Sequence, residues 1–154
     1  MTQELDPTDR RLLELLQQHG RLSNVELAER LNLSATPVAR RWKRLEEQGY
    51  IKGYTALVDQ KRAGFAVTAY VSVRLRANEW RTAETFERAV QNLTQVMECS
   101  VVTGSCDYML RVVARDLEDY ERFLKHELAV IDAISTMDST LVLNRIVSRT
   151  ELPI

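Results

Sequence analysis

The sequence predicts an α+β protein with an N-terminal helix-turn-helix (winged-helix-like) domain and a C-terminal ferredoxin-like βαββαβ plait. Up to about residue 48, apolar residues recur at helical spacing in three short segments, and the last two are separated by a short turn. After residue 64 the spacing changes to that of half-buried strands, and strand and helix patterns then follow in plait order. The expected divisions are therefore residues 1–53, an extended linker at 54–64, and residues 65–154.

The first segment has the start and stop signals of an amphipathic helix. Asp6 is expected as the N-cap, Pro7 as the first helical residue and Asp9 as the third. Gly20 is expected to end the helix, because glycine is common directly after a helix C-terminus. The apolar face consists of Leu12, Leu13, Leu15 and Leu16.

The second segment opens with a capping box, in which Ser23 is the N-cap and Glu26 the third helical residue. A short helix is expected through about Leu31. Asn32 stands where a turn glycine is more usual, since asparagine also tolerates the left-handed conformation. Ser34 then caps a third helix, which completes a helix-turn-helix layout. The residues available for burial are Val25, Leu27, Ala28 and Leu31.

The third helix concentrates positive charge. Four of the five residues at 40–44 are basic, in a chain whose formal net charge is -1. At about 100° per residue, Val38, Trp42 and Leu45 share one stripe at the spacing of buried residues. The helix is therefore expected to have an apolar back, formed by these three residues, and a basic front.

The front of this helix is basic and bears a hydroxyl group. Such a face is typical of a surface that follows DNA phosphates, and the alternative is the solvated face of an ordinary surface helix. The residues on it are Thr36, Arg40 and Lys43, with Arg44 and Pro37 beside them and Arg41 on the flank.

The composition indicates a soluble globular protein of a reducing cytoplasm. Residues 1–63 carry 11 basic and 9 acidic side chains, whereas residues 64–154 carry 10 and 13, so the positive half holds the basic helix. Two cysteines do not make a disulfide framework. The polar N-terminus does not have the pattern of a signal peptide, and no apolar run has the length of a membrane span.

The second half begins with extended chain at residues 50–58. A strand follows in which apolar and polar residues alternate over 71–76, and a helix capped by Asn78 comes next. The burial candidates are Ile51, Leu57 and Val58 in the extended chain, Val71, Val73 and Leu75 in the strand, and Ala83, Phe86, Val90 and Leu93 in the helix.

Two further strands are predicted at 96–102 and 106–114, joined by a glycine turn at 103–105. Asp116 caps another helix, and a last strand covers about 135–147. The burial candidates are Leu117, Tyr120, Leu124 and Leu128 in the helix, and Leu141, Leu143 and Ile146 in the strand.

The reactive side chains do not assemble into a catalytic or metal-binding pattern. In a tight hairpin Cys99 faces Leu110, so a disulfide with Cys106 is not expected, and Cys99 is interpreted as a small core residue. A redox or metal role for Cys106 stays open, but two cysteines without a suitable histidine do not complete a zinc site. His19 and His126 are interpreted as surface or capping residues, and the common catalytic and nucleotide-binding motifs are missing. We expect no enzyme, no metal and no cofactor.

The order and spacing of short motifs along nearly the whole chain resemble the Lrp/AsnC (feast/famine) family of transcription regulators, and most of all its leucine-responsive branch. The motifs are Leu5-Asp6, Gly20-Arg21-Leu22-Ser23, Glu26-Leu27-Ala28, Leu33-Ser34, Arg41, Arg44-Leu45-Glu46, Gly49-Tyr50-Ile51, Gly53-Tyr54, Thr103-Gly104, Asp107-Tyr108 and the helix start from Asp116 to Tyr120.

The resemblance implies that the first domain binds double-stranded DNA and that residues 54–64 include a hinge strand that pairs with a partner subunit. It implies dimers that assemble into octamers, with the plait as the interface. The expected DNA-contacting residues are Ser23, Asn24, Ser34, Thr36, Pro37, Arg40, Arg41, Lys43 and Arg44.

The resemblance also implies a free amino acid as effector, bound between dimers at the plait. A glycine turn at Gly104 exposes backbone N–H groups to a carboxylate, and Asp107 can accept from an ammonium, although a hairpin turn with a capping aspartate explains the same residues. Ser105 and Cys106 depart from the acidic or aromatic residues usual in the family. The expected effector residues are Thr103, Gly104, Ser105, Cys106, Asp107, Tyr108, Thr140 and Leu141.

These expectations combine into a regulator whose assembly and DNA affinity respond to an amino acid. The alternative is a stand-alone amino-acid-sensing plait whose N-terminal helices make only protein contacts. Salt-dependent DNA binding distinguishes the two.

Overall fold

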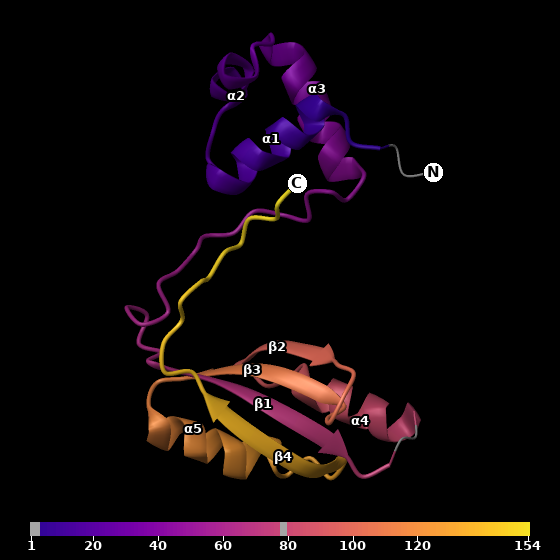
Figure 1. Cartoon of the computed structure of the whole chain (residues 1–154), viewed down its shortest axis with the longest axis vertical. Helices are drawn as coiled ribbons and strands as arrows, with labels where there is room; N and C mark the ends of the chain where they lie inside the picture. The colour runs from indigo at the N-terminus through magenta and orange to yellow at the C-terminus, as the bar shows by residue number, and fades with distance from the viewer. Residues whose placement is uncertain (1–3, 78–79) are drawn as a thin grey trace. The chain divides into compact units, whose positions relative to one another are not determined.

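The computed structural model describes residues 4–77 and 80–154, which form two compact units (Figure 1). One unit contains the chain up to Leu57 together with Ile146–Ile154, and the other is Val58–Arg145. The C-terminal residues belong to the helical unit because Leu152 N donates to Gln17 Oε1 at 2.6 Å, and Ile154 packs against the helical core. The sequence had placed these last residues with the plait.

Helix α1 (Pro7–Gln18) begins with a reciprocal capping box. Asp9 N donates to the Asp6 carboxylate at 2.8 Å, and Asp6 N donates to the Asp9 carboxylate at 3.3 Å. Two N–H groups that a helix start leaves unpaired are thereby satisfied. The C-cap is His19, so Gly20 stands directly after the helix C-terminus, as predicted. The backbone of Gly20 does not have the positive φ that is common for glycine at this position.

Helices α2 (Asn24–Leu31) and α3 (Ala35–Glu47) form the predicted helix-turn-helix. The predicted capping box of Ser23 is present at the start of α2. Asn32 has the left-handed conformation, with φ of 52°, which turns the chain toward the start of α3. Ser34 is the N-cap of α3, but its side chain makes no capping hydrogen bond.

The core of the helical unit is built around the leucines of α1. Val38 and Leu45 of α3 are fully buried, and Trp42 covers the edge of the core as a partly buried residue. Val25 is 60% exposed, contrary to expectation, because it lies roughly 200° around α2 from the buried Leu27. The remaining buried members are Leu12, Leu13, Leu15, Leu16 and Ala28.

Residues 51–59, between α3 and the plait, contain no helix or turn, in line with the predicted extended chain, and residues 60–64 form a turn. No strand is assigned in this stretch, residues 48–66, all of which the structure describes. Ile51 packs against the helical core, but Leu57 and Val58 are 74% and 72% exposed. Their predicted burial is therefore not found within a single chain.

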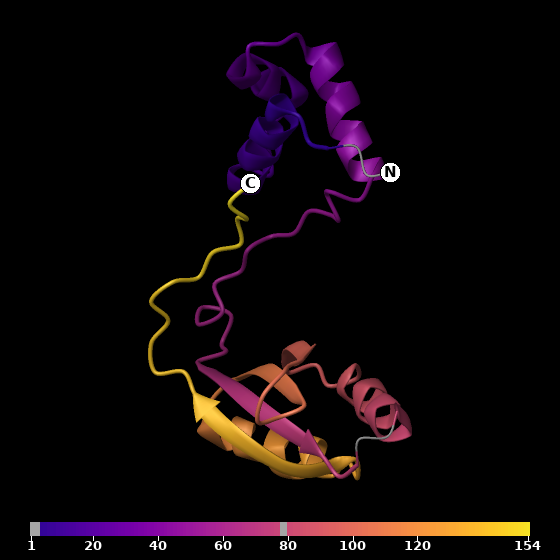
Figure 2. The ribbon, with the colours of Figure 1, turned by 45° about the vertical axis from the view of Figure 1, so that its right-hand side comes forward.

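The second unit is a four-stranded antiparallel sheet with two helices packed on one of its faces (Figures 1 and 2). The strand order is β2-β3-β1-β4, which confirms the βαββαβ plait. The elements are β1 (Val67–Leu75), α4 (Trp80–Val90), β2 (Val96–Val101), β3 (Tyr108–Ala114), α5 (Leu117–Phe123) and β4 (Ile134–Leu141).

Strand β1 has the predicted alternation, because Val71, Val73 and Leu75 are buried whereas Arg74 between them is exposed. Helix α4 contributes Phe86 and Val90 to the same core, as its spacing predicted. The predicted cap of that helix, Asn78, lies outside the described residues.

Helix α5 departs from the prediction in one position. Asp116 caps it as expected, and Tyr120 is buried. Leu117, however, is 60% exposed, and the fully buried residue of this helix is Phe123. The π-helical segment Leu124–Leu128, which continues the helix, keeps Leu128 in the core.

Strand β4 is shorter than predicted. It ends at Leu141, which pairs with Ala69 near the start of β1, so little of β1 remains to pair with later residues. Leu143 is 96% exposed and Ile146 82% exposed, and their predicted strand positions are wrong.

The two ends of α5 give a matched test of the plait core. Phe123→Ala is expected to lower the free energy of unfolding by about 3–5 kcal/mol, because it leaves a cavity among fully buried side chains. Leu117→Ala, at an exposed position of the same helix, is expected to stay within about 0.5 kcal/mol of the wild type. Urea unfolding measures both, and equal losses would contradict the described packing.

Candidate nucleic-acid interface and ligand site

The outward face of α3 is defined by the residues that the core does not take up. Thr36, Arg40 and Lys43 are exposed, while Val38 and Leu45 on the opposite side are fully buried. Arg40 makes no ion pair with any residue that the structure describes. Lys43 Nζ lies 3.6 Å from Glu47, an exposed pair that contributes little to stability. The face thus presents two exposed cations and a hydroxyl group to solvent.

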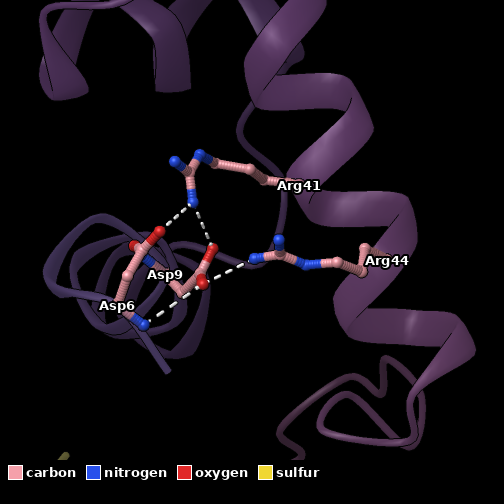
Figure 3. A network of polar contacts seen from close by, with 4 residues as sticks. All are labelled: Asp6, Asp9, Arg41 and Arg44. Carbon is pink, nitrogen blue, oxygen red and sulfur yellow. Dashed lines mark hydrogen bonds and ion pairs between the residues drawn. The ribbon is translucent and has the colours of Figure 1, made fainter. Parts of the chain in front are cut away.

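Arg41 and Arg44 point toward α1 instead (Figure 3). Arg41 Nη1 lies 2.5 Å from Asp6 Oδ2 and 2.9 Å from Asp9 Oδ1. Arg44 Nη2 lies 2.5 Å from Asp9 Oδ2. The sequence had placed Arg44 on the outward face, which is wrong for its guanidinium, because the long side chain reaches around the helix to a buried carboxylate.

The same four residues form the acid–base network of the helical unit. The Asp9 backbone N–H and the Arg41 guanidinium hold the pKa of the Asp6 carboxyl below its ordinary value of 3.8. The two carboxylates, Asp6 first, raise the pKa of Arg41 above its already high value. Asp6 and Arg41 are therefore both charged at neutral pH.

Trp42 connects α3 to the extended chain that follows it. Its Nε1 donates to the Tyr54 hydroxyl, which in turn donates to Glu46 at 2.9 Å. The two rings also meet edge to face, with centroids 6.2 Å apart. The predicted burial on the back of α3 is confirmed for Val38 and Leu45, whereas Trp42 is only partly buried.

In the plait, the loop between β2 and β3 is held by Asp107. Its backbone N–H donates to Val73 O at 2.9 Å, and its Oδ2 accepts from Leu75 N at 2.8 Å. The aspartate thus caps the end of β1, where the pairing with β4 shifts register. Gly104 in the loop has φ of 117°, which favours glycine.

A cavity of about 310 Å³ opens beside this loop. Arg74, whose guanidinium donates to the Ser105 carbonyl, is one of the residues that line this cavity. The Oδ1 atom of Asp107, another lining residue, has no hydrogen-bond partner among the described residues. Sequence reasoning missed Arg74 and Arg76; the only signal was their place on the wet face at the end of β1. The lining residues are Arg74, Leu75, Arg76, Ala77, Gly104, Ser105 and Asp107.

The structure brings together only part of the predicted effector set. Tyr108 is turned to the helix side of the sheet, where its hydroxyl donates to Glu87 at 2.6 Å. Burial, followed by that carboxylate, raises the pKa of the Tyr108 phenol strongly, so it remains a donor. Thr103 and Cys106 do not line the cavity beside Gly104.

The two β4 residues of the predicted effector set lie away from the loop. Thr140 pairs with Tyr70, and Leu141 with the residue before it, in the first half of β1, whereas Asp107 bonds to Val73 and Leu75 at its end. Within one chain these residues do not share the cavity.

Cys99 is a correction. Its pairing with Leu110 is confirmed, but Cys99 is exposed and is not a core residue, because β2 is an edge strand of the sheet. Across the described residues, no three histidine, cysteine or acidic side chains are grouped in a way that could hold a metal ion.

A three-helix unit with a basic outward helix, joined to a plait with a loop cavity, is the architecture of a transcription regulator with a separate ligand-binding domain. The chain matches the winged helix-turn-helix DNA-binding domain over residues 5–52 and the Lrp/AsnC ligand binding domain over residues 68–152. The protein belongs to the Lrp/AsnC family of DNA-binding transcription regulators.

The relatives match nearly the whole length of the chain. It is 40% identical to the Bkd operon transcriptional regulator of Pseudomonas aeruginosa, covering 98% of this chain and 99% of that one. It is 36% identical to the leucine-responsive regulatory protein of Escherichia coli, covering 93% and 87%. A Neisseria meningitidis transcriptional regulator, solved as its L-Met complex, superposes with a TM-score of 0.94 at 34% identity, covering 97% of both chains.

These relatives are regulators and not enzymes, in agreement with the expectation from the sequence. None of the helices that the structure describes is long and apolar enough to cross a membrane.

The ion pair between Asp6 and Arg41 predicts that the stability of the fold falls in acid. A lowered folded pKa means that ionised Asp6 stabilises the fold above pH 3.8, and this contribution is lost as the pH falls through the lowered value. Asp6→Asn keeps a capping oxygen but loses the charge. The melting temperature of the wild type should exceed that of Asp6→Asn at neutral pH, and the gap should narrow in acid. A gap independent of pH would contradict the pairing.

Proposed function

We propose that the protein binds specific double-stranded DNA sites in the cytoplasm through the outward face of α3, and that a free amino acid bound at the plait regulates this binding. The observation that carries the proposal is the exposed face of Thr36, Arg40 and Lys43 on a helix whose back is fully buried. A helix presented in this way fits the major groove, where basic side chains contact phosphates and base edges. The short residues Ser34 and Pro37 at its N-terminal end let the backbone approach the DNA closely.

The N-terminal turn of helix α2 supplies further contacts with the DNA. Ser23 and Asn24 lie at the N-terminus of that helix, where backbone N–H groups and the helix dipole favour a phosphate. Such contacts set the register of the recognition helix on the duplex without reading bases.

A single recognition helix gives little specificity, so we infer that a dimer reads two half-sites. Support comes from the apolar side chains that a single chain leaves uncovered, among them Leu57, Val58 and Leu143. A second copy that pairs along the extended chain would cover them. Dimers that assemble further into an octamer fit the same proposal.

We infer that the effector lies in the cavity beside Gly104. Asp107 Oδ1 faces no protein donor among the described residues and suits the ammonium, while Arg74 and the backbone N–H groups near Gly104 suit the carboxylate. The L-Met complex of one relative and the leucine-responsive name of another support an apolar amino acid as the first to test. The ligand favours whichever assembly binds it better, and DNA affinity follows by linkage.

The alternative is a plait sensor that acts through protein contacts alone. The match to a DNA-binding domain and the exposed cations of α3 favour the first proposal.

Substitutions on α3 test the DNA face. Arg40→Gln should weaken binding to an operator selected from random sequences by roughly 1–3 kcal/mol if the arginine reads a base. If it contacts only phosphate, it should weaken all duplexes alike and lower the salt slope by about 1. Arg62→Gln, an exposed arginine of the other unit, is the control. Binding unchanged by both substitutions would contradict the assignment.

Calorimetric titration of L-methionine and L-leucine tests the effector site. Asp107→Asn keeps an oxygen for Leu75 N but removes the charge, so affinity should fall about ten-fold or more while DNA binding without effector is retained. Glu118→Gln, an exposed acid on α5, is the control. Equal affinities in wild type and Asp107→Asn would show that the aspartate only caps β1.

A further inference from the structure

The carboxylate of Asp9 is the most enclosed charge of the helical unit. Its side chain is 3% exposed, and it accepts from Arg41 on one oxygen and from Arg44 on the other. The two arginines lie three positions apart on α3, so both project from one side of that helix toward α1 (Figure 3). The Asp6 N–H donates to the same carboxylate at 3.3 Å.

This geometry leaves the arginines little freedom to turn to DNA. A buried carboxylate that loses its cations becomes an uncompensated charge, which is a costly state. The Nε atom of the Arg44 guanidinium is buried, and it has no hydrogen-bond partner among the described residues. Arg40 and Lys43, in contrast, carry no such buried partner.

We propose that Asp9 is a positioning residue for DNA recognition: it holds Arg41 and Arg44 against α1, fixes the rotation of α3, and withholds half of the basic cluster from the phosphates. The inference rests on the proposed DNA binding through α3 and divides its four cations into two functions. Arg40 and Lys43 meet DNA, whereas Arg41 and Arg44 orient the helix that presents them.

This division has a measurable electrostatic consequence. Each phosphate that a cation neutralises contributes about one unit to the slope of log affinity against log salt. A cation that stays on Asp9 contributes nothing to that slope, although it contributes to stability. The salt dependence of DNA binding and the melting temperature therefore distinguish a cation that contacts DNA from one that holds α3 in place.

The first test compares Arg44→Gln with Arg40→Gln in the full-length protein, using a mixed-sequence duplex at several salt concentrations. Arg40→Gln should lower the slope by about 1 at an unchanged melting temperature. Arg44→Gln should leave the slope unchanged and lower the melting temperature, and Asp9 still keeps Arg41 in this variant. A slope reduced equally by both variants would overturn the inference.

The second test removes the carboxylate that the two arginines share. Arg41 keeps its ion pair with Asp6 in Asp9→Asn, whereas Arg44 loses its carboxylate partner. Asp9→Asn should therefore steepen the slope by about 1 and raise affinity for the mixed-sequence duplex, because the Arg44 cation becomes available to a phosphate. Glu14→Gln is the matched control, since it removes an acid of the same helix that pairs only with the exposed Arg11. A folded Asp9→Asn with the wild-type slope would overturn the inference.

The two proposals fail in different ways. A wild type without salt-dependent DNA binding would end the proposed function itself. The wild type and Arg40→Gln could both behave as expected while Arg44→Gln shows the same reduced salt slope as Arg40→Gln. That result would overturn only the inference on Asp9. The arginine variants decide the matter even if Asp9→Asn does not fold.

Discussion

A carboxylate that water cannot reach must keep its cations, and in the helical unit this constraint falls on Asp9. The residue belongs to the capping box of α1, so its position is set by the start of that helix. Arg41 and Arg44 form ion pairs with this carboxylate, and these pairs fix the side of α3 that faces α1. The buried Val38 and Leu45 add the apolar part of the same restraint. What remains of α3 is the face available to a partner.

The plait uses an aspartate in a related way. One carboxylate oxygen of Asp107 accepts a hydrogen bond from the backbone of β1, and this bond holds the loop at the end of the strand. Asp107 and Arg74 also line the neighbouring cavity. A structural bond of this kind pre-orients a carboxylate for a ligand, because the side chain needs no reordering when a ligand binds. The two readings of Asp107 from the sequence, a cap and a ligand contact, are therefore compatible.

Local features were predictable from the sequence because they depend on neighbours in the chain. The N-cap Asp6, the capping box of Ser23, the left-handed Asn32, the alternation of β1 and the pairing of Cys99 with Leu110 all follow from such short-range rules. The order of strands and helices followed from the periods of the apolar residues.

What the sequence could not supply depends on distant residues. Helical period places the Cα of Arg44 on the outward side, but it does not reveal that Asp9, 35 positions earlier, draws the guanidinium inward. Likewise Cys99 has the pattern of a core residue, and only the sheet order shows that its strand is at the edge. The end of β4 depends on where β1 begins, which no local pattern encodes.

If α3 presents Arg40 and Lys43 to DNA while Asp9 retains Arg41 and Arg44, a crystal structure of the protein bound to an operator duplex should show it in the arginine–carboxylate distances. Arg41 and Arg44 are expected to stay within hydrogen-bond distance of Asp9, and Arg40 and Lys43 are expected to contact the DNA. An Arg44 guanidinium on a phosphate, with the Asp9 carboxylate left behind, would contradict this expectation.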